Sequence, residues 1–312
     1  MRIQRFAAGC VCLLALAALM TGCGGGGGGA ASSLLPAIAY MHQAAGGDQE
    51  VWLMKLDGSQ KTAIAAVAGE DCIQGALSPD GRKLAYVQQD GSSSKIVIKD
   101  LKTGATTVVL TDATSGGNDF APAWSPDGTK IAYRDDRDQS IHVMNADGTG
   151  DAQITPGDDE HAPAWNKNGT KLVYDKGWNG SIAVCNASDG SDETIILPDT
   201  VHSYGQPQFL PDGRIIAMRN TSGGSKDIVI CNADGSNETV LTPDTDTSDE
   251  FFPSCYRSKI AYASNVAGQK DCYIATLSGS TLTDVTNLTA DDNDNSWRPK
   301  LGVIDTSYFT LP

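Results

Sequence analysis

The sequence predicts an all-β domain, a six-bladed β-propeller with four-stranded blades, and two observations carry this prediction. One unit recurs along the chain about every 41 to 47 residues, which is the length of a propeller blade. Each unit contains short runs of alternating or β-branched apolar residues, separated by Pro-Asp-Gly and Asp-Gly turns. After Ser33 the chain sustains no apolar spacing of the kind that marks an amphipathic helix.

The clearest copy of the unit starts with an innermost segment that contains Pro122 and Trp124. This segment ends in the Pro-Asp-Gly turn at 126–128, where Pro presets φ and Gly supplies a positive φ. An Asp-Gly turn at 147–148 lies between two later apolar runs, which is among the strongest hairpin signals in a sequence. The three strands after the innermost segment are expected at 130–133, 141–144 and 153–155.

The four segments recur around the expected ring. The innermost segment occurs six times, centred on Gly75, Pro122, Pro163, Pro207, Pro253 and Pro299. The return strand also occurs six times, at 37–42, 83–86, 130–133, 171–174, 215–218 and 259–262. The third strand is expected at 51–54, 96–99, 141–144, 182–185, 228–231 and 272–275, and the outermost strand is visible at 109–111, 153–155, 240–242 and 287–289.

The order of segments at the two ends of the domain predicts how the ring closes. The domain opens with a return strand, Ala37 to His42, and ends with an innermost strand, Arg298 to Leu301. We therefore expect the C-terminal strand to join the N-terminal blade. This closure removes the sheet edges that an open stack of blades would expose.

The combination P-x-W-S-P-D-G-x-K-I-A-Y, then N-A-D-G, then L-T resembles the TolB-type propeller repeat, and it extends from Ala37 to Leu301. The resemblance implies the propeller fold and a place in the cell envelope. Related repeats occur in the peptidoglycan-associated translocation protein TolB, in propellers of prolyl-oligopeptidase-like enzymes and in lipoproteins. We expect this chain to differ from TolB in lacking its N-terminal α/β domain.

The N-terminal segment has the layout of an export signal. Arg2 and Arg5 give it a positive start, and its apolar run, 11–20, is too short to span a membrane. The next residues, 19–23, resemble the bacterial lipoprotein box, in which the cysteine is acylated. We expect residues 1–22 to be a lipoprotein signal peptide and Cys23 to carry lipid; the alternative is an ordinary cleaved secretory signal.

Residues 23–36 are expected to form a tether, because six consecutive glycines cannot bury enough apolar surface to become ordered. The propeller is then expected to occupy residues 37–312. In Gram-negative lipoproteins a residue other than Asp after the acylated cysteine favours the outer membrane, and here that residue is Gly24. We expect the protein to be anchored there, on the periplasmic face or the cell surface.

Composition excludes one class of partner. The chain has 23 basic and 38 acidic side chains and a net charge of −15, and loss of Arg2 and Arg5 with the signal makes this about −17. A nucleic-acid ligand is disfavoured, because the phosphate backbone requires a basic surface. Five cysteines remain in the domain without a zinc-site spacing, and we expect small buried residues, with a single disulfide as the alternative. These cysteines are Cys72, Cys185, Cys231, Cys255 and Cys272.

No motif for catalysis or cofactor binding is recognisable. The chain has four histidines but no GxSxG, HExxH, P-loop or Rossmann fingerprint. We therefore expect no cofactor beyond the lipid. The acidic run at 291–295 is expected to be a solvated loop, with a calcium site as the alternative. Trp124 and Trp165 occupy repeated positions and are expected to pack between blades, whereas Trp178 and Trp297 are better placed for exposed contacts.

One repeat position suggests a binding site. Acidic residues stand three places before the proline of the innermost segment in three blades, and innermost strands line the channel, so we expect a polar ring at one channel mouth. This ring would receive a peptide, a cation or a basic side chain. The alternative is that each carboxylate accepts backbone N–H groups of its own turn. The candidates are Asp119, Glu160 and Glu250, with Tyr204 at the equivalent position and His161 and His202 nearby; Cys72 and Ser296 also occupy this position.

Together these features predict a non-enzymatic, lipid-anchored, monomeric propeller that binds envelope proteins or peptides through a basic segment of the partner. The alternative is a carbohydrate- or peptide-processing lyase or hydrolase that uses the acids of the channel mouth. An enzyme should bring together an acid, a base and usually an arginine or a metal, whereas only acids and two histidines are expected to converge here.

Overall fold

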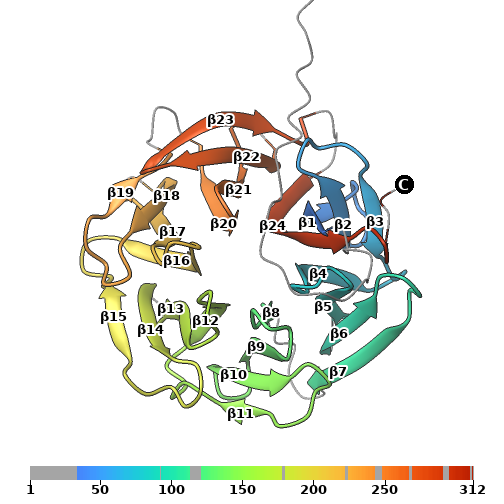
Figure 1. Cartoon of the computed structure of the whole chain (residues 1–312), viewed down its shortest axis with the longest axis horizontal. Coiled ribbons are helices and arrows are strands. Elements are labelled where there is room, and N and C mark those ends of the chain that lie inside the picture. Colours follow the sequence, from blue (N-terminus) through green and yellow to red (C-terminus); the bar gives the residue numbers. More distant parts are fainter. Residues whose placement is uncertain are drawn as a thin grey trace, which may run out of the picture. The chain divides into compact units, whose positions relative to one another are not determined.

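The computed structural model of the chain describes residues 34–91, 93–112, 121–177, 180–221, 224–242, 248–266, 269–290, 295–309 and 311. Within them, six four-stranded antiparallel sheets are arranged as a ring around a channel (Figure 1), which confirms the predicted six-bladed propeller. The predicted signal, Cys23, Asp119, Trp178 and the loop 291–294 lie outside the described residues. The described residues form no helix that is long and apolar enough to cross a membrane.

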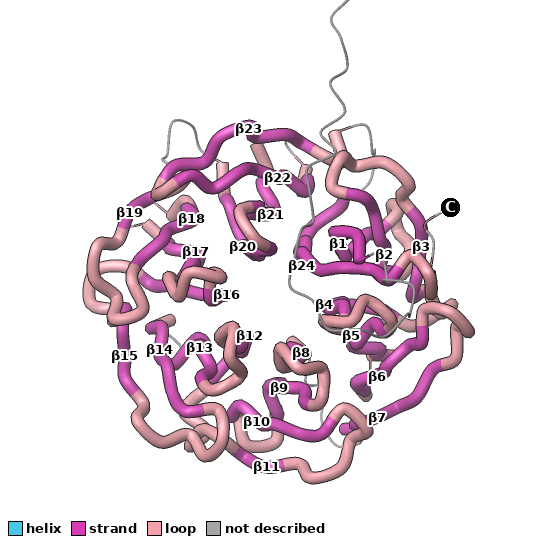
Figure 2. Tube along the Cα trace, viewed as in Figure 1, coloured by secondary structure: helices cyan, strands magenta, loops and turns pink. Residues whose placement is uncertain are grey.

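The first blade joins the two ends of the domain. Its strand order is β24 (Asn295–Asp305), β1 (Leu34–Gln43), β2 (Glu50–Lys55) and β3 (Thr62–Ala65). Strand β24 pairs antiparallel with β1 from Leu34↔Asp305 to Gln43↔Asn295, and the two strands lie side by side in Figure 2. The predicted closure of the ring by the C-terminal strand is therefore confirmed.

The other five blades follow in chain order, each from the channel outward. The second blade contains β4 (Asp71–Leu77), β5 (Lys83–Gln89), β6 (Ser94–Asp100) and β7 (Thr106–Asp112); the third contains β8 (Ala123–Trp124), β9 (Lys130–Asp135), β10 (Ser140–Asn145) and β11 (Ala152–Gln153). The fourth contains β12 (Glu160–Trp165), β13 (Lys171–Lys176), β14 (Ser181–Asn186) and β15 (Thr194–Leu197). The fifth contains β16 (Ser203–Phe209), β17 (Ile215–Asn220), β18 (Lys226–Cys231) and β19 (Thr239–Val240). The sixth contains β20 (Glu250–Tyr256), β21 (Lys259–Ser264), β22 (Asp271–Ser278) and β23 (Thr281–Asn287).

Apolar side chains hold neighbouring blades together. Six buried clusters occur in the described part of the chain; five draw on two adjacent blades, and one draws on the first, second and third blades. The indole Nε1 of Trp124 donates to the Ala76 carbonyl of the preceding blade at 3.0 Å, and Trp165 donates to the Ala123 carbonyl at the same distance. These tryptophans pack between blades, as the repeat predicts. All five described cysteines are unbridged, and only Cys255 is more than marginally accessible.

One Asp-Gly turn shows why glycine is required at this point of the repeat. Gly190 has φ +71°, and a Cβ there would lie 1.9 Å from the carbonyl oxygen of Ile154 in the preceding blade. The turn between the third and fourth strands thus packs directly on the neighbouring backbone. Any side chain would force the two blades apart.

Candidate functional site

The same backbone distortion lines the channel in every blade. One residue of each innermost segment has a positive φ, between 37° and 57°, and it directly precedes a proline, or Gly75 in the second blade. The pairing register shifts at this point in the first, second, fourth, fifth and sixth blades, which marks a β-bulge. Positive φ is rare for non-glycine residues and concentrates at functional sites. The six bulge residues are Gln74, Ala121, Ala162, Gln206, Phe252 and Arg298.

The bulges define a narrow channel. All six bulge residues, with their neighbours, line a cavity of about 70 Å³ at the centre of the ring. Among its lining residues the charged ones are Arg298 and Lys300, and none is an acid. The channel therefore carries positive charge although the protein as a whole is acidic.

Side chains from neighbouring blades hold the bulges in place. Gln74 Oε1 accepts the N–H of Ala121 at 2.6 Å, and Gln206 Oε1 accepts the N–H of Phe252 at 2.8 Å. The N–H of Gln206 is in turn held by Asp175 Oδ1 at 2.7 Å. These bonds link blades around the channel. Sequence reasoning missed both glutamines, although their shared repeat position was a visible signal.

At one end of the channel the innermost strands begin, and there lies a pocket of about 520 Å³ that we call the polar mouth. The Arg134 guanidinium is buried there, 3.2 Å from Asp159 and 2.7 Å from Asp136, and it also contacts the His161 ring. His161 lies 3.0 Å from Asp159. Charged groups of both signs thus pair with one another around this opening. The polar side chains that line it are Arg134, Gln139, Asp159, His161, Asp175, Ser203, Tyr204, Gln206, Asn220 and Arg298.

The two predicted acids that the structure describes, Glu160 and Glu250, lie inside their blades. The Glu160 carboxylate is fully buried and accepts the N–H groups of Gly157 at 3.2 Å and Asp158 at 3.0 Å. Burial raises its pKa, whereas Lys176, at 3.4 Å, opposes the rise. The Glu250 carboxylate accepts from two serine hydroxyls of its own blade, at 2.8 and 2.9 Å. The Glu160 contacts correspond to the alternative in which a carboxylate accepts the backbone N–H groups of its own turn, whereas Glu250 accepts from serine hydroxyls. A role of these acids in partner binding stays a prediction.

The other candidates are divided between the polar mouth and the blade interior. His161 and Tyr204 line the polar mouth, and the Tyr204 hydroxyl donates to Glu238 at 2.9 Å. His202 is not among the lining residues; its ring meets that of Tyr204 edge-on, and its Nδ1 is buried with no hydrogen-bond partner in the described part of the chain. Sequence reasoning thus found two residues of this pocket and missed Arg134 and Asp175.

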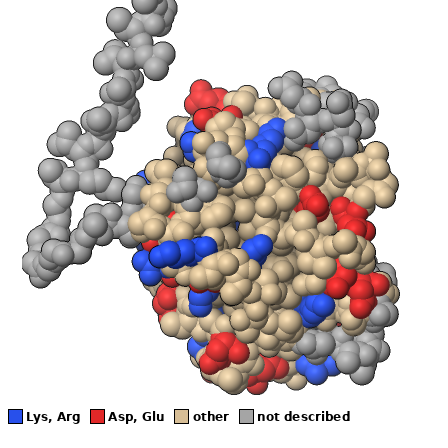
Figure 3. Space-filling view, turned by 90° about the vertical axis from the view of Figure 1, so that its right-hand side faces the viewer, with Lys and Arg blue, Asp and Glu red and all other residues tan. Residues whose placement is uncertain are grey.

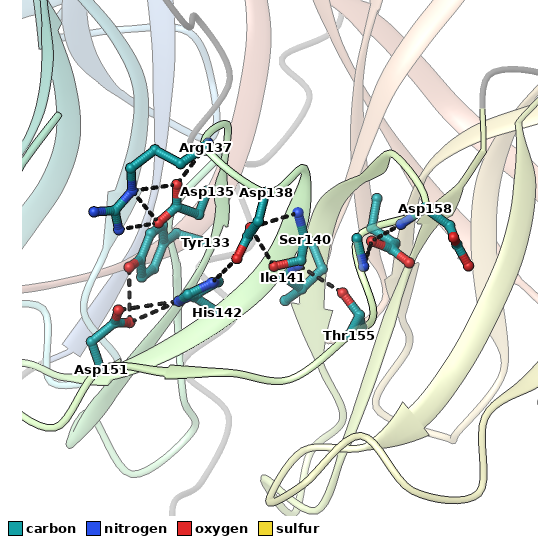
Figure 4. A network of polar contacts seen from close by, with 12 residues as sticks. Tyr133, Asp135, Arg137, Asp138, Ser140, Ile141, His142, Asp151, Thr155 and Asp158 are labelled. Atoms are coloured by element: carbon teal, nitrogen blue, oxygen red, sulfur yellow. Dashed lines mark hydrogen bonds and ion pairs between the residues drawn. The ribbon is translucent and has the colours of Figure 1, made fainter. Parts of the chain in front are cut away.

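A polar network fixes the third blade (Figure 4). His142 lies between two carboxylates, with Nε2 3.0 Å from Asp138 and Nδ1 3.1 Å from Asp151, and the Tyr133 hydroxyl donates to Asp151 at 2.8 Å. Burial opposes ionisation of Asp138, yet hydrogen bonds from Ser140 and His142 hold its pKa below the usual value. The pKa of Tyr133 is raised, chiefly by burial and to a smaller extent by the hydrogen bond to Asp151. The network ties β9, β10 and the following turn together and does not line the polar mouth.

At the opposite end of the channel the innermost strands end, and a second pocket of about 440 Å³ opens, which we call the aromatic mouth. Leu77, Trp124, Trp165, Phe209 and Tyr256 supply its large apolar side chains. Its charged lining residues are Lys167, Arg257 and Lys300. The two mouths of one channel therefore differ in chemistry.

No metal site accompanies either mouth in the described part of the chain, where no three His, Cys, Asp or Glu side chains are grouped so that they could hold an ion. The side view in Figure 3 shows acidic and basic side chains interspersed on that face of the molecule. The net negative charge is therefore not collected into a single patch on that face.

The sequence of the chain is similar to proteins of a known family. A sequence family described as TolB beta propeller domain matches residues 29–301. Over 74 residues the chain is 39% identical to the Tol-Pal system protein TolB of Haemophilus influenzae, a match that covers 23% of this chain and 17% of that protein.

Solved structures with the same fold include proteins of different kinds. The structure of TolB from Acinetobacter baumannii is similar with a TM-score of 0.70 at 18% identity, over 85% of this chain and 66% of that one. An oligogalacturonate lyase in complex with manganese is similar with a TM-score of 0.55 at 15% identity, over 80% and 74%. At these identities the likeness shows the fold alone, and the chain spans less than two thirds of both TolB proteins.

Proposed function

Because the chain belongs to the TolB β-propeller family, we propose that it is a non-enzymatic propeller of the bacterial cell envelope that binds protein or peptide partners. The observation that carries this proposal is the polar mouth, an open pocket that presents charges of both signs on a closed ring. Paired charges held on rigid strands suit recognition by shape and charge complementarity. A relative named for the Tol-Pal system supports a role in the envelope.

The pairing of groups at the polar mouth favours binding over catalysis. General acid–base chemistry needs a group that can exchange a proton with the substrate. Here His161 and Arg134 both contact Asp159, and Asp175 holds the N–H of Gln206. This arrangement supports a binding protein over the alternative, a lyase or hydrolase acting on carbohydrate or peptide.

The partner offers a basic segment to the polar mouth. Asp159 and Asp175 line this pocket, and the predicted acids Glu160 and Glu250, at the starts of two innermost strands, add negative potential from within their blades. A net charge of −15 steers cationic segments toward the protein, and salt screens this attraction over about 8 Å at physiological ionic strength.

A lipid on Cys23 holds the monomeric propeller at the outer membrane. A glycine-rich tether of this length is expected to reach roughly 17 Å, which keeps the ring close to the bilayer surface. Labelling cells with a fatty-acid probe tests this part of the proposal. The wild-type protein should carry the label and Cys23→Ala should not; a Cys23→Ala protein that keeps the label or sediments with membranes contradicts it.

The binding proposal is tested with isosteric charge removal. The double variant Asp159→Asn and Asp175→Asn keeps the amide oxygens as acceptors but removes two negative charges. We expect it to capture less partner from solubilised envelope, with a flatter dependence on salt, because less charge attracts the basic segment. Asp284→Asn, on the outermost strand of the sixth blade, is the matched control. Unchanged capture by a double variant with wild-type thermal unfolding contradicts the proposal.

A further inference from the structure

We infer that the aromatic mouth is a second binding site, which takes an acidic peptide segment and places one of its carboxylates in the channel beside Lys300. This site differs from the polar mouth in position and in charge, and it goes beyond the proposed function. Three observations carry the inference: the sign of the charges, the state of Lys300, and the size and lining of the space.

The charges around this site are all of one sign. The aromatic mouth is lined by Lys167, Arg257 and Lys300, the narrow channel by Arg298 and Lys300, and no Asp or Glu lines either space. This is the reverse of the composition, in which acids outnumber bases by 38 to 23. A cation-lined cleft with low-dielectric walls attracts anions.

In the described part of the chain, Lys300 has no counterion. It lies on β24, and no described residue donates to, accepts from or forms an ion pair with its ammonium group. The ionisable groups that face it are the Arg298 guanidinium on its own strand and the Cys255 thiol on β20. Asp212, whose negative charge also acts on this thiol, is already paired with Arg214 at 2.8 Å.

Burial lowers the pKa of Lys300 to about 8, and the positive charge of Arg298 adds to this effect, whereas the Cys255 thiol opposes it. At pH 7 the ammonium is therefore still mostly protonated. A partly buried cation without a partner costs free energy, which an incoming carboxylate would offset. The folded protein thus holds a charged site that is prepared for an anion.

The size of the space selects a carboxylate over larger anions. The narrow channel of about 70 Å³ has room for a few water molecules, which a carboxylate on one or two methylenes can displace. The faces of Trp124 are packed between blades and leave this residue 9% exposed, so it offers no platform for sugar stacking.

The lining of the aromatic mouth fits the rest of a peptide. Trp165, Phe209 and Tyr256 surround the entrance, where apolar neighbours of the acidic residue can pack. Arg257 lies over the Tyr256 ring at 5.3 Å from its centre, at the rim, where it can meet a second carboxylate. An extended segment with acidic and aromatic or aliphatic residues matches both features.

The test uses labelled synthetic peptides and the full-length chain made without lipid through Cys23→Ala. The probe is fluorescein-Gly-Leu-Glu-Phe-Gly-amide, and its matched control has Gln in place of Glu. We expect saturable binding of the Glu peptide, at least tenfold weaker binding of the Gln peptide, and at least tenfold weaker binding of the Glu peptide to Lys300→Met. Lys102→Met, an exposed lysine of the second blade, should bind as the wild type does.

A second measurement keeps the inference testable if Lys300→Met changes the fold. Calorimetry of the Glu peptide with the unsubstituted ring at pH 8, in two buffers of different ionisation enthalpy, should show proton uptake, because a bound carboxylate raises the pKa of the lysine. Equal binding of both peptides, absence of proton uptake, or competition by oligogalacturonate but not by the unlabelled Glu peptide each overturns the inference. The Asp159→Asn and Asp175→Asn variant should bind this peptide normally, so this site and the proposed function fail independently.

Discussion

The closing strand β24 gives the sharpest stability prediction. Ile304 is 3% exposed and belongs to the cluster between the first and second blades, where Leu53 and Leu84 are also buried. Ile304→Ala removes three carbons from this contact and leaves a cavity where the chain closes on itself. Such substitutions cost about 2–5 kcal/mol. Because the strand is held along its whole length by β1, the site has little freedom to collapse, and we expect about 3–4 kcal/mol.

The assay is urea unfolding followed by tryptophan fluorescence, since Trp52, Trp124 and Trp165 lie in three different blades. With a slope of about 3 kcal/mol per molar, Ile304→Ala should lower the unfolding midpoint by about 1 M. The matched control is Val285→Ala on β23, whose side chain is exposed and should change stability by less than about 0.5 kcal/mol.

Deleting residues 295–312 removes β24 completely and so tests its contribution to stability more severely. The deletion removes the buried side chains of Leu301, Val303 and Ile304, each contributing about 1.5–3 kcal/mol, and it exposes the edge of β1. The sum, about 5–9 kcal/mol, is comparable to the whole stability of a typical domain. The truncated chain should therefore fail to fold or should aggregate. The role assigned to β24 is refuted if Ile304→Ala has the same urea unfolding midpoint as the Val285→Ala control. It is also refuted if the truncated chain unfolds like the wild type.

Three further predictions concern substitutions at Gly190, Glu160 and Lys300. Gly190→Ala should destabilise by more than about 2 kcal/mol, because a positive φ and a backbone clash combine there, whereas Gly279→Ala, which meets no atom within 4 Å, should cost only about 1 kcal/mol for its φ; thermal unfolding compares them. Glu160→Ala should cost about 1–3 kcal/mol by leaving two turn N–H groups unsatisfied, whereas Glu160→Gln should retain most of the stability, and equal losses in urea would contradict the turn role. Lys300→Met should be more stable than wild type below about pH 8, and its advantage should disappear as the pH rises toward about 10.4, because the native lysine loses its proton first and the unfolded one later; an advantage that does not vary with pH contradicts the buried charge.

Ring closure could be predicted because it depends only on the order of segments. A return strand at Ala37–His42 and an innermost strand at Arg298–Leu301 each lacked a partner in their own end of the chain, so pairing them was the one arrangement that completed six blades. The turns were predictable for a similar local reason. Asp-Gly and Pro-Asp-Gly steps dictate backbone angles that few other residues adopt.

The channel lining could not be predicted, because its conformation runs against local preference. A residue before proline usually adopts an extended conformation with negative φ, yet Ala162 and Phe252 have positive φ. The resulting bulges change which side chains face the channel, and no alternation pattern reveals such a shift. The sequence therefore identified the repeat position of Glu160 but left two orientations of its carboxylate open, toward the channel mouth or into its own turn, and the structure shows the second.

Apart from His161 and Tyr204, the polar side chains of the polar mouth could not be predicted, for a different reason. Its contacts join residues far apart in the chain, such as Gln206 with Phe252, or Arg134 with Asp159 and His161. No local sequence pattern marks any of these residues within its own blade. Closure of the ring brings their side chains to one opening. Charges on separate repeats cannot be paired from spacing alone.

Site-specific crosslinking in the native envelope tests most directly whether this propeller binds its partner at the polar mouth. A photoreactive phenylalanine analogue is placed at His161, in the polar mouth, or at Val285, an exposed position on the outermost strand β23. We expect a discrete protein adduct on irradiation of the His161 protein, lost in the Asp159→Asn and Asp175→Asn background, and none from the Val285 protein. Adducts that form equally from both positions, or from Val285 alone, would contradict it.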